Sequence, residues 1–555
     1  MSDENLTFFG IDLGTTYSVV SYIDETGRPA VVRNVITNDE TTPSVVYFEE
    51  GTGEVVVGEA AKRVSRLYPS RVVERVKRSM GREAQWEFDD TTYTPESISA
   101  LILKQLAQDA EYYTKRPVRQ VVITVPAYFG LLERDATRNA GTIAGLDVVE
   151  VVPEPVAAAL QYDLGGESSR TVLVYDLGGG TFDTTVIRID ADTVEVLCTD
   201  GDQQLGGADW DARLVQYLVD EFVGHSGPAD DPTLDEEFMQ DLALTAEEVK
   251  QQLSTVTSRR VPMRYAGAST SVEVTRDAFE EITRDLLDRT VEYTERTLNT
   301  LGDKLGIADP AAAIDEVLLV GGSSKMPAVA RRLAEKWGWT PRLHDPDLAV
   351  AKGAARFALS RALWAWDGQG EAPTAEEKQQ RASALALTLG VDEESLSNAS
   401  RRIVTVLPKS FGVRLQDTSA PDWRSQPEKM FVGHLVHANE ALPIEGRKLD
   451  ASTVEDGQTA IQIAIYEQAG AAESPDLTAN KPVDRGAGVI DGLPPLPRHS
   501  PIAITMGVSP GGELRLHAVE PTSGQELTIN VQVSVLSEDE VHQAREVVAA
   551  LTVRG

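Results

Sequence analysis

Short apolar runs alternate with amphipathic stretches over residues 1–365. The runs Val121–Val125 and Glu316–Val320 predict fully buried strands. Apolar residues recur at helical spacing over Glu96–Tyr113, and the preceding Thr94, followed by proline, is typical of a helix start. The same periodicity predicts one continuous helix over Asp277–Leu301. This alternation indicates an α/β domain over residues 1–365.

The pattern changes after residue 365. Residues 366–402 are rich in charged side chains and predict a linker or insertion that is helical in part. From residue 403 to residue 536, short strand-like runs separated by turn signals predict an all-β sandwich. The final segment, 537–555, begins with the spacing of a helix. We therefore expect four parts: 1–365, 366–402, 403–536 and 537–555.

One sequence pattern occurs twice. FGIDLGTTY at Phe9–Tyr17 and VYDLGGGTFD at Val174–Asp183 both place Asp-Leu-Gly after an apolar run and before threonine and an aromatic residue. A motif repeated at this distance predicts two copies of one subdomain. In each copy, the strand that ends in Asp-Leu-Gly is expected to turn directly back into a second strand.

The glycines of these repeats allow the backbone to approach another group closely. Successive N–H groups can then form a concave anion site, and two facing loops would hold a di- or triphosphate from both sides. The carboxylates of Asp12 and Asp176 suit a hydrated Mg²⁺, and the Thr15 and Thr181 hydroxyls can bond phosphate oxygens. The sequence contains neither a P-loop nor a dinucleotide fingerprint. The competing interpretation, a simple hairpin turn in each repeat, is weakened by a third cluster, Gly321-Gly322-Ser323, after another buried strand.

Composition narrows the function classes. The formal net charge is −35, which argues against nucleic-acid binding because polyanions would be repelled. The single cysteine, Cys198, rules out a disulfide within the chain and fits a reducing compartment. The acidic N-terminus lacks the features of a signal peptide, and no apolar run is long enough for a membrane span. We expect a cytoplasmic protein that binds neither nucleic acid nor membrane.

Several segments resemble the Hsp70 chaperone family in order and spacing, over nearly all of residues 1–365. These segments are Phe8–Ser18, Val125–Phe129, Ala140–Leu146, Pro153–Ala159, Val172–Asp183, Leu205–Asp211 and Leu318–Pro327. The resemblance implies the duplicated actin-like (ribonuclease-H-like) ATPase fold, with ATP or ADP, Mg²⁺ and K⁺ as a candidate second cation. A weaker resemblance, best at Gly492–Arg498, implies that the family's β-sandwich peptide-binding domain follows.

The resemblance also implies roles for individual residues. The implied catalytic residues are Lys77, Glu154, Asp176, Thr181 and Asp183, and the implied metal-site residues are Asp12, Glu154, Asp176 and Asp183. The implied nucleotide contacts are Asp12, Gly14, Thr15, Thr16, Tyr17, Gly178, Gly179, Gly180, Gly206, Gly207, Glu247, Lys250, Ser254, Gly321, Gly322, Ser323, Lys325 and Asp347. On spacing alone, Lys77 could equally be a solvated surface lysine, and Glu247 with Lys250 an exposed helical pair.

The chain departs from the family pattern at three positions. Gln251 and Lys325 stand where arginines are usual, which predicts weaker stacking on adenine and a lower affinity for ATP. Glu150 stands where an arginine usually contacts J-domain proteins. This charge reversal favours a dedicated J-domain partner, with a nucleotide exchange factor as a further expected partner.

In the β half, the weaker resemblance places Val432, Val454, Ile461 and Ile463 along a cleft for extended apolar peptides of unfolded proteins. The competing interpretation is that these side chains form ordinary sandwich core. The family continues into a helical lid, whereas only the short segment 537–555 follows here. We therefore expect a truncated lid and fast peptide exchange.

The sequence leaves three functions open. The first, which we favour, is an ATP-driven chaperone. The second is a nucleotide-gated holdase, scaffold or exchange factor with little ATP turnover, which ATPase rates with and without peptide would separate from the first. The third is a sugar kinase or filament-forming protein on the same ATPase fold. The β half disfavours the kinase, and sedimentation with ATP would reveal filaments.

Overall fold

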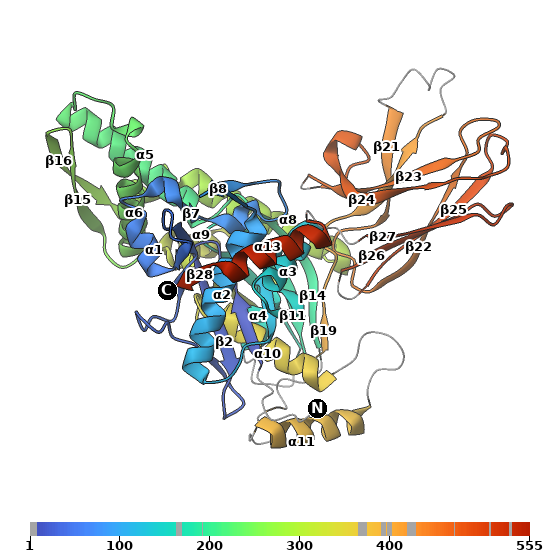
Figure 1. The fold of residues 1–555 in the computed structure, drawn as a ribbon, viewed down its shortest axis with the longest axis horizontal. Coiled ribbons are helices and arrows are strands. Elements are labelled where there is room, and N and C mark those ends of the chain that lie inside the picture. The colour runs from blue at the N-terminus through green and yellow to red at the C-terminus, as the bar shows by residue number, and fades with distance from the viewer. Residues whose placement is uncertain are drawn as a thin grey trace. The chain divides into compact units, whose positions relative to one another are not determined.

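The structure is a computed structural model of the chain. It describes residues 8–162, 169–190, 193–343, 345–364, 374–389, 396, 402–418, 429–470, 472–509, 512–531 and 536–555. Its contacts define two compact units (Figure 1). Unit 1 contains Met1–Ala127, Ala136–Ile403 and Glu538–Gly555, and unit 2 contains Tyr128–Asp135 and Val404–Ser537. In the part of the chain that is described, no helix has the length and apolar character that crossing a membrane requires.

The first large sheet of unit 1 has the strand order β11-β10-β1-β2-β3. β1 (Phe9–Asp12) turns back into β2 (Tyr17–Ile23) as an antiparallel hairpin, and β10 (Gln120–Val125) joins β1 in parallel. The sheet is completed by β3 (Pro29–Val31), β4 (Thr42–Pro43), which pairs with β2, and β11 (Asp147–Pro153). We call the part of unit 1 built on this sheet lobe I.

The second large sheet has the order β18-β17-β12-β13-β14-β19. β12 (Arg170–Leu177) and β13 (Phe182–Ile189) form an antiparallel hairpin, and β17 (Glu316–Val320) joins β12 in parallel. The remaining strands are β14 (Thr193–Asp202), β18 (Arg342–Leu343) and β19 (Arg402–Val404). The arrangement of lobe I therefore recurs in this part, which we call lobe II. The predicted duplication is confirmed.

Helices position the two sheets. α4 (Glu154–Gln161) contacts strands of both sheets, and α10 (Ala349–Trp364) packs on α4 and on β1, β2 and β10. α10 lies so close that a Cβ on Gly10 of β1 would be 2.2 Å from the Ala355 nitrogen. The other helices include α1 (Glu59–Val64), α2 (Pro95–Thr114), α3 (Leu131–Ile143), α5 (Gly207–Ser226), α6 (Glu236–Leu253), α7 (Arg276–Ile282), α8 (Arg284–Leu305), α9 (Pro327–Trp337) and α11 (Ala375–Leu389).

Two predicted elements differ from the structure. The helix expected over Asp277–Leu301 is divided into α7 and α8 at Thr283, which leaves helical geometry at φ −116° and ψ 8°. The run Ile403–Leu407, expected to begin the sandwich, is divided. Ile403 and Val404 lie in β19, which pairs with β14 of lobe II, whereas Val406 bridges to Ala441 and Leu407 is buried in the sandwich core. An apolar strand can extend the edge of either sheet, so its sequence does not reveal which sheet it joins.

The charged stretch 366–402 is only partly described. Within it, α11 packs Ala382, Leu385 and Ala386 on an apolar cluster that includes Leu359 and Leu363 of α10. The helix therefore belongs to the body of unit 1. The rest of the predicted linker, at 366–373, 390–395 and 397–401, lies outside the described residues.

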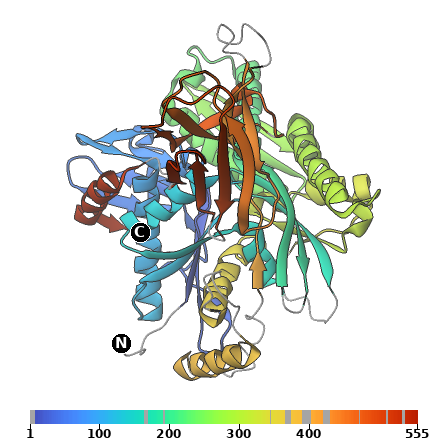
Figure 2. The same ribbon diagram turned by 90° about the vertical axis from the view of Figure 1, so that its right-hand side faces the viewer.

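The C-terminal segment packs on lobe I. The helix expected after residue 537 is present as α13 (Glu538–Ala550), and the chain then continues into β28 (Thr552–Arg554). β28 extends a small sheet of order β28-β6-β5-β7, formed with β5 (Val45–Phe48), β6 (Glu54–Val57) and β7 (Val72–Glu74). Figures 1 and 2 both show α13, in red, beside the blue N-terminal part of the chain. This segment, interpreted from the sequence as a lid stub, contacts lobe I.

Unit 2 contains two antiparallel sheets, of order β21-β20-β23-β24 and β22-β25-β26-β27, drawn as orange to dark red arrows in Figure 2. Their shared core includes Phe411, Ile465, Met506 and Leu516. The strands are β20 (Phe411–Gln416), β21 (Met430–Val436), β22 (Ile444–Ser452), β23 (Ile461–Gln468), β24 (Asn480–Ile490), β25 (Pro501–Val508), β26 (Leu514–Val519) and β27 (Glu526–Val531). The predicted all-β architecture is confirmed, but β22 and β24 were missed because polar residues and glycines obscure their alternation.

Candidate functional site

Two hairpin loops, one from each lobe, meet at the centre of unit 1. The β1–β2 loop carries Thr15 and Thr16, and the β12–β13 loop carries Gly179 and Gly180. A Cβ on Gly180 would lie 2.3 Å from Thr15 Cγ2, and a Cβ on Gly179 would lie 2.0 Å from Thr16 Oγ1. Only glycine fits at these two positions without moving the opposing loop. The repeated motifs therefore face each other in direct contact.

Three carboxyl groups lie on the strands that enter these loops. Asp12 ends β1, while Asp176 and Asp183 are opposite each other in the β12–β13 hairpin and are 6 % and 1 % exposed. Burial, and after it the nearby Glu154, raise the pKa of Asp12 to about 7, while Lys77 opposes the rise. Burial, Glu154 and Asp12 likewise raise the pKa of Asp176 well above its usual range. The site concentrates negative charge that its own residues only partly neutralise.

A buried ion pair supplies the cation of this cluster. Lys77, in the short helix η2 (Val76–Ser79), donates to Glu154 Oε1 at 2.5 Å, and the two residues are 5 % and 6 % exposed. Burial lowers the pKa of Lys77, but Glu154 and Asp12 outweigh it and raise the pKa above its ordinary value. Lys77 is therefore held as a charged, buried group. The alternative that it is a solvated surface lysine is wrong.

The carboxyl groups suit a hydrated metal ion. Among the described residues, no group of three or more His, Cys, Asp or Glu is arranged to hold an ion by itself. Mg²⁺ is usually held by one or two carboxylates and keeps several of its waters. Asp12 and Asp176 provide two such carboxyl groups. Because the pKa of each is raised, a nearby cation would stabilise its ionised form. This donor set fits a hydrated Mg²⁺ and does not fit an ion surrounded by protein ligands alone.

Arg78, the neighbour of Lys77, connects the lobes and was missed by the sequence analysis. Its Nε donates to the Gly180 carbonyl at 2.8 Å, and its Nη2 donates to Asp209 Oδ2 at 2.6 Å. Asp209 also accepts from the Gly206 N–H at 2.8 Å, where α5 begins. An arginine of lobe I thus holds both the glycine loop and a helix start of lobe II. The sequence shows that the start of α5 is acidic, but it does not show that Arg78 is the partner of Asp209.

A second connection between the lobes lies at Tyr17. Lys62 of α1 donates to Glu247 Oε2 at 2.7 Å and to the Tyr17 hydroxyl at 3.0 Å. Glu247 belongs to α6 of lobe II and also accepts from Gln251 Nε2 at 3.2 Å. Mutual attraction raises the pKa of Lys62 despite its burial. Glu247 therefore pairs with lobe I, so the alternative interpretation, an exposed helical pair of Glu247 with Lys250, is wrong.

Lys250 instead forms a buried pair with Asp211. Its Nζ lies 2.8 Å from Asp211 Oδ2 and 2.9 Å from the Gly207 carbonyl oxygen. A Cβ on Gly207 would be 2.3 Å from Ser323 Oγ. The structure thus brings together Gly207, Lys250 and Ser323, three of the predicted nucleotide contacts. Asp211 is a further residue of this cluster that the sequence analysis did not single out.

The third glycine cluster, Gly321-Gly322-Ser323, lies beside Asp176 on one side and beside Asp347 on the other. A Cβ on Gly321, whose φ is +80°, would lie 2.5 Å from Asp176 Oδ1. A Cβ on Gly322 would lie 3.3 Å from Asp347 Oδ1, and Asp347 forms an ion pair with Lys325. Residues 321–325 therefore link the carboxyl cluster to the Lys325–Asp347 pair.

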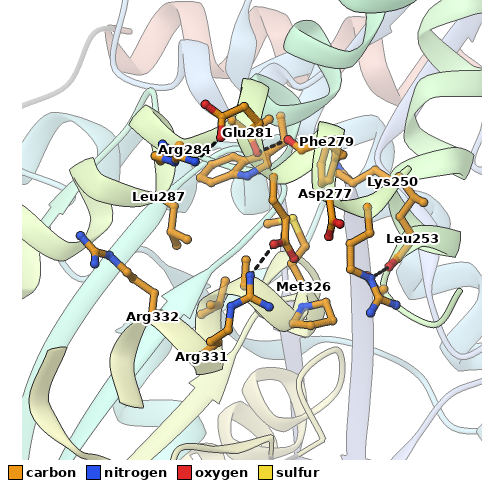
Figure 3. A pocket seen from close by; sticks show the side chains of 18 of the residues that line it. Lys250, Leu253, Asp277, Phe279, Glu281, Arg284, Leu287, Met326, Arg331 and Arg332 are labelled. Carbon is orange, nitrogen blue, oxygen red and sulfur yellow. Dashed lines mark hydrogen bonds and ion pairs between the residues drawn. The ribbon is translucent and has the colours of Figure 1, made fainter. Parts of the chain in front are cut away.

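A cavity of about 440 Å³ opens beside Lys250 and Ser254. Its other walls come mainly from α7, α8 and α9, with Phe279, Leu287 and Met326 among the apolar lining (Figure 3). A cavity of this size accommodates a small molecule. It adjoins the residues predicted to bind a nucleoside.

The four predicted peptide contacts all lie in unit 2. Val432 and Ile463 are 1 % and 4 % exposed, and Ile463 belongs to the sandwich core. Ile461 is half-buried against that core, and Val454 is half-buried in the loop after β22. The core interpretation therefore accounts for Ile463, whereas Val454 and Ile461 keep partly exposed side chains.

The duplicated sheets, the facing glycine loops and the buried Lys77–Glu154 pair define an ATPase of the actin-like class. The comparison with protein families agrees: the family described as Hsp70 protein matches residues 8–90 and 83–359. The chain belongs to the Hsp70 family. It is thus an ATP-hydrolysing molecular chaperone of the DnaK type.

Relatives similar to this chain carry the name "Chaperone protein DnaK". The protein from Thermotoga petrophila is 35 % identical over 558 residues, which cover 98 % of this chain and 84 % of the relative. That from Thermotoga neapolitana is 35 % identical over 96 % of this chain and 81 % of the relative. That from Thermosipho africanus is 34 % identical over 98 % and 83 %, respectively. The similarity therefore extends through the β half.

The buried Lys250–Asp211 pair gives a stability prediction. Asp211→Ala should lower the free energy of unfolding by about 3–5 kcal/mol, because Lys250 would remain buried without its carboxylate. Asp285→Ala removes the partner of Arg213 in an exposed pair and should cost at most about 1 kcal/mol. Urea unfolding of the nucleotide-free protein measures both changes. Equal losses in the two variants would contradict the prediction.

Proposed function

We propose that this Hsp70 chain hydrolyses ATP between its two lobes, with the phosphates held by the facing β1–β2 and β12–β13 loops. The observation that carries the proposal is the direct contact of these loops beside the buried Lys77–Glu154 pair. The loops would offer backbone N–H groups, and Thr15, Thr16 and Thr181 would offer hydroxyls, to the phosphate oxygens. The glycines at 14, 178, 179 and 180 would keep these N–H groups accessible.

Asp12, Asp176, Glu154 and Asp183 are proposed to hold a hydrated Mg²⁺ beside the β- and γ-phosphates, with Asp12 and Asp176 nearest to it. When bound, Mg²⁺ would neutralise phosphate charge during phosphoryl transfer. Lys77 would place its ammonium at the γ-phosphate, where negative charge develops. Glu154 keeps Lys77 in position through their 2.5 Å contact and would orient the attacking water. K⁺ is proposed as a second cation.

The nucleoside is proposed to lie between α6 and residues 321–325. Gly206, Gly207 and Ser323 would line the ribose end, and Glu247, Lys250 and Ser254 would face the nucleoside from α6. Lys325 and Asp347 would close the opposite side, with Gly321 and Gly322 giving the backbone room to approach. Tyr17 would contact the phosphate end through the β1–β2 loop. Of these residues, Lys250 and Ser254 also line the 440 Å³ cavity.

Unit 2 is proposed to bind extended apolar segments of unfolded proteins. The β-sandwich architecture and the similarity to DnaK chaperones over 98 % of the chain support this. Val454 and Ile461 are the better candidates for direct contact, with Val432 and Ile463 supporting them from beneath. Co-chaperones are expected for a protein of this family.

A dedicated J-domain protein and a nucleotide exchange factor are the proposed co-chaperones. Glu150 on β11 lies 3.6 Å from an Arg138 guanidinium nitrogen and 3.7 Å from an Arg361 guanidinium nitrogen. A J-domain protein that binds here would need to complement one glutamate and two arginines, rather than the single arginine that is usual in the family. We also propose a cytoplasmic location, which the buried, unpaired thiol of Cys198 supports.

Thr181 provides the most direct test of turnover. In single-turnover hydrolysis, Thr181→Ala should lower the rate about 100-fold, because the variant lacks the hydroxyl that is proposed to bond a phosphate oxygen during hydrolysis. Thr245→Ala is the matched control, since that half-buried hydroxyl donates to the Asp241 carbonyl within α6. An extended apolar peptide should accelerate hydrolysis by the wild type.

The same experiment separates the alternative functions. No hydrolysis by either protein would overturn the enzyme assignment. If the peptide leaves the rate of wild-type hydrolysis unchanged, the result would favour the second candidate, a holdase or scaffold in which the two units are uncoupled. The observation that favours this candidate is Gln251, where the chain lacks the family's planar cation.

Gln251 is exposed, and its side chain donates to Glu247 Oε1 at 3.2 Å within its helix and also bonds the Tyr17 hydroxyl. We predict a lower affinity for ATP than in typical family members, and Gln251→Arg should tighten binding about two- to fivefold by restoring a cation over adenine. Gln216→Arg is the control, because Gln216 is an exposed glutamine on α5 that likewise donates to a carboxylate four residues away, at Asp220. Calorimetric titration measures both. An unchanged dissociation constant in Gln251→Arg would contradict the prediction.

A further inference from the structure

The 440 Å³ cavity lies in lobe II, and most of its wall is separate from the predicted nucleotide contacts. Of those contacts, all of which the structure describes, Lys250 and Ser254 line the cavity and the others do not. The rest of the wall comes mainly from α7, α8 and α9, with Trp210 of α5 and Leu253 of α6. The cavity is therefore a chamber beside the proposed nucleoside position rather than a part of it.

One part of the cavity wall is apolar. Trp210, Phe279 and Met326 line the cavity and are 2 %, 4 % and 6 % exposed. They come from α5, from α7 and from the residue that precedes α9, so three separate elements supply them. Aromatic faces and a thioether pack well against a flat ring. This part of the wall suits a planar apolar body.

Most cationic groups around the cavity already have partners. Arg284 pairs with Glu281, and Arg332 pairs with Asp288 at 2.8 Å. Arg276 donates to two backbone carbonyl oxygens, in and just after the last turn of α6, at 2.7 and 2.9 Å. These guanidinium groups are therefore engaged with the protein itself. The wall has little positive charge to offer an anionic ligand.

Carboxylates of the wall, by contrast, keep unused acceptors. Glu280 Oε2 accepts from Arg331, whereas Glu280 Oε1 is buried and has no hydrogen-bond partner among the described residues. Asp277 and Glu335 also line the cavity, and neither forms an ion pair with a described residue. A buried carboxylate oxygen without a donor is costly. The cavity therefore favours a cationic ligand that donates hydrogen bonds.

The arginine that holds Glu280 can be replaced at low cost. Arg331 reaches this carboxylate from α9, and Figure 3 marks the contact with a dashed line. The side chain of Arg331 is 51 % exposed, whereas that of Glu280 is 21 % exposed. Because water already solvates Arg331, it loses little when another cation takes its place. An amidinium has the same planar set of N–H groups as arginine and can bond both oxygens of a carboxylate.

We propose that this cavity is a second small-molecule site of unit 1, which takes a planar aromatic cation. The amidinium or guanidinium group of the ligand pairs with the Glu280 carboxylate, and its ring packs against Trp210, Phe279 and Met326. The ligand lies beside the proposed nucleoside position, so it binds together with ADP. Binding of the ligand requires no ATP turnover.

Benzamidine is the probe, and ligand-observed NMR titration of the full, nucleotide-free chain measures its dissociation constant. The wild type should bind it with a dissociation constant on the order of 1 mM, as expected for a fragment of this size. Glu280→Gln should weaken binding about tenfold, because the amide keeps the shape but loses the charge. Glu295→Gln is the matched control, since Glu295 likewise pairs with a cation of α9, Lys336 at 2.6 Å, but does not line the cavity.

Two further comparisons separate pairing with Glu280 from loss of structure. Benzamide, the uncharged analogue, should bind the wild type about tenfold more weakly than benzamidine. Arg331→Met removes the cation that competes for Glu280 and should tighten benzamidine binding at least about twofold, a gain that a misfolded variant would not show. Unchanged or weaker binding in Arg331→Met would overturn the pairing with Glu280.

The same titration with saturating ADP and Mg²⁺ tests whether the site is separate. The benzamidine dissociation constant of the wild type should change by less than about twofold. Loss of benzamidine binding when ADP is bound would overturn the separate site. No benzamidine binding by the wild type, or equal binding by Glu280→Gln and Glu295→Gln, would overturn the proposal as a whole. Absence of ADP binding would count against the proposed function and leave the cavity assignment standing.

Discussion

The structure of unit 1 depends on burying several carboxyl groups beside a single lysine where its two lobes meet. Glu154 lies close enough to Asp12 and Asp176 to raise the pKa of both, and Lys77 neutralises only part of the charge of the cluster. Such a cluster is costly to bury unless a cation or protons compensate it. The facing glycine loops allow the two lobes to approach closely enough to form it. The fold therefore buries carboxyl groups whose negative charge the cation of a metal–nucleotide complex would compensate.

Side chains from one lobe that pair with the other surround this charge cluster. Arg78 holds the Gly180 carbonyl and Asp209 across the lobes, while Lys62 pairs with Glu247 farther along α6. Neither pair is fully exposed, so each is less screened by solvent than a surface pair. The position of one lobe relative to the other is thus coupled to the geometry of the site.

What the sequence predicts well is local. The two Asp-Leu-Gly hairpins and the start of α2 at Thr94 follow from glycine, threonine and proline chemistry within a few residues, and the repeated motif predicts the duplicated fold. The partners of Arg78 and Lys250 could not be predicted, because tertiary folding brings distant segments together. The sequence analysis grouped Ile403 and Val404 of β19 with the sandwich and did not predict β28, since a short apolar strand can extend any open sheet edge. The helix break at Thr283 leaves the apolar periodicity intact, so the spacing of apolar residues does not reveal it.

The most direct measurement of the central claim is calorimetric titration of ADP with and without Mg²⁺, using the wild type, Asp12→Asn and Asp176→Asn. If the buried carboxyl cluster needs a compensating cation, Mg²⁺ should tighten ADP binding to the wild type strongly. In each asparagine variant this gain should shrink, because one of the carboxylates that attract the ion is gone. A Mg²⁺ effect of equal size in all three proteins would contradict the account.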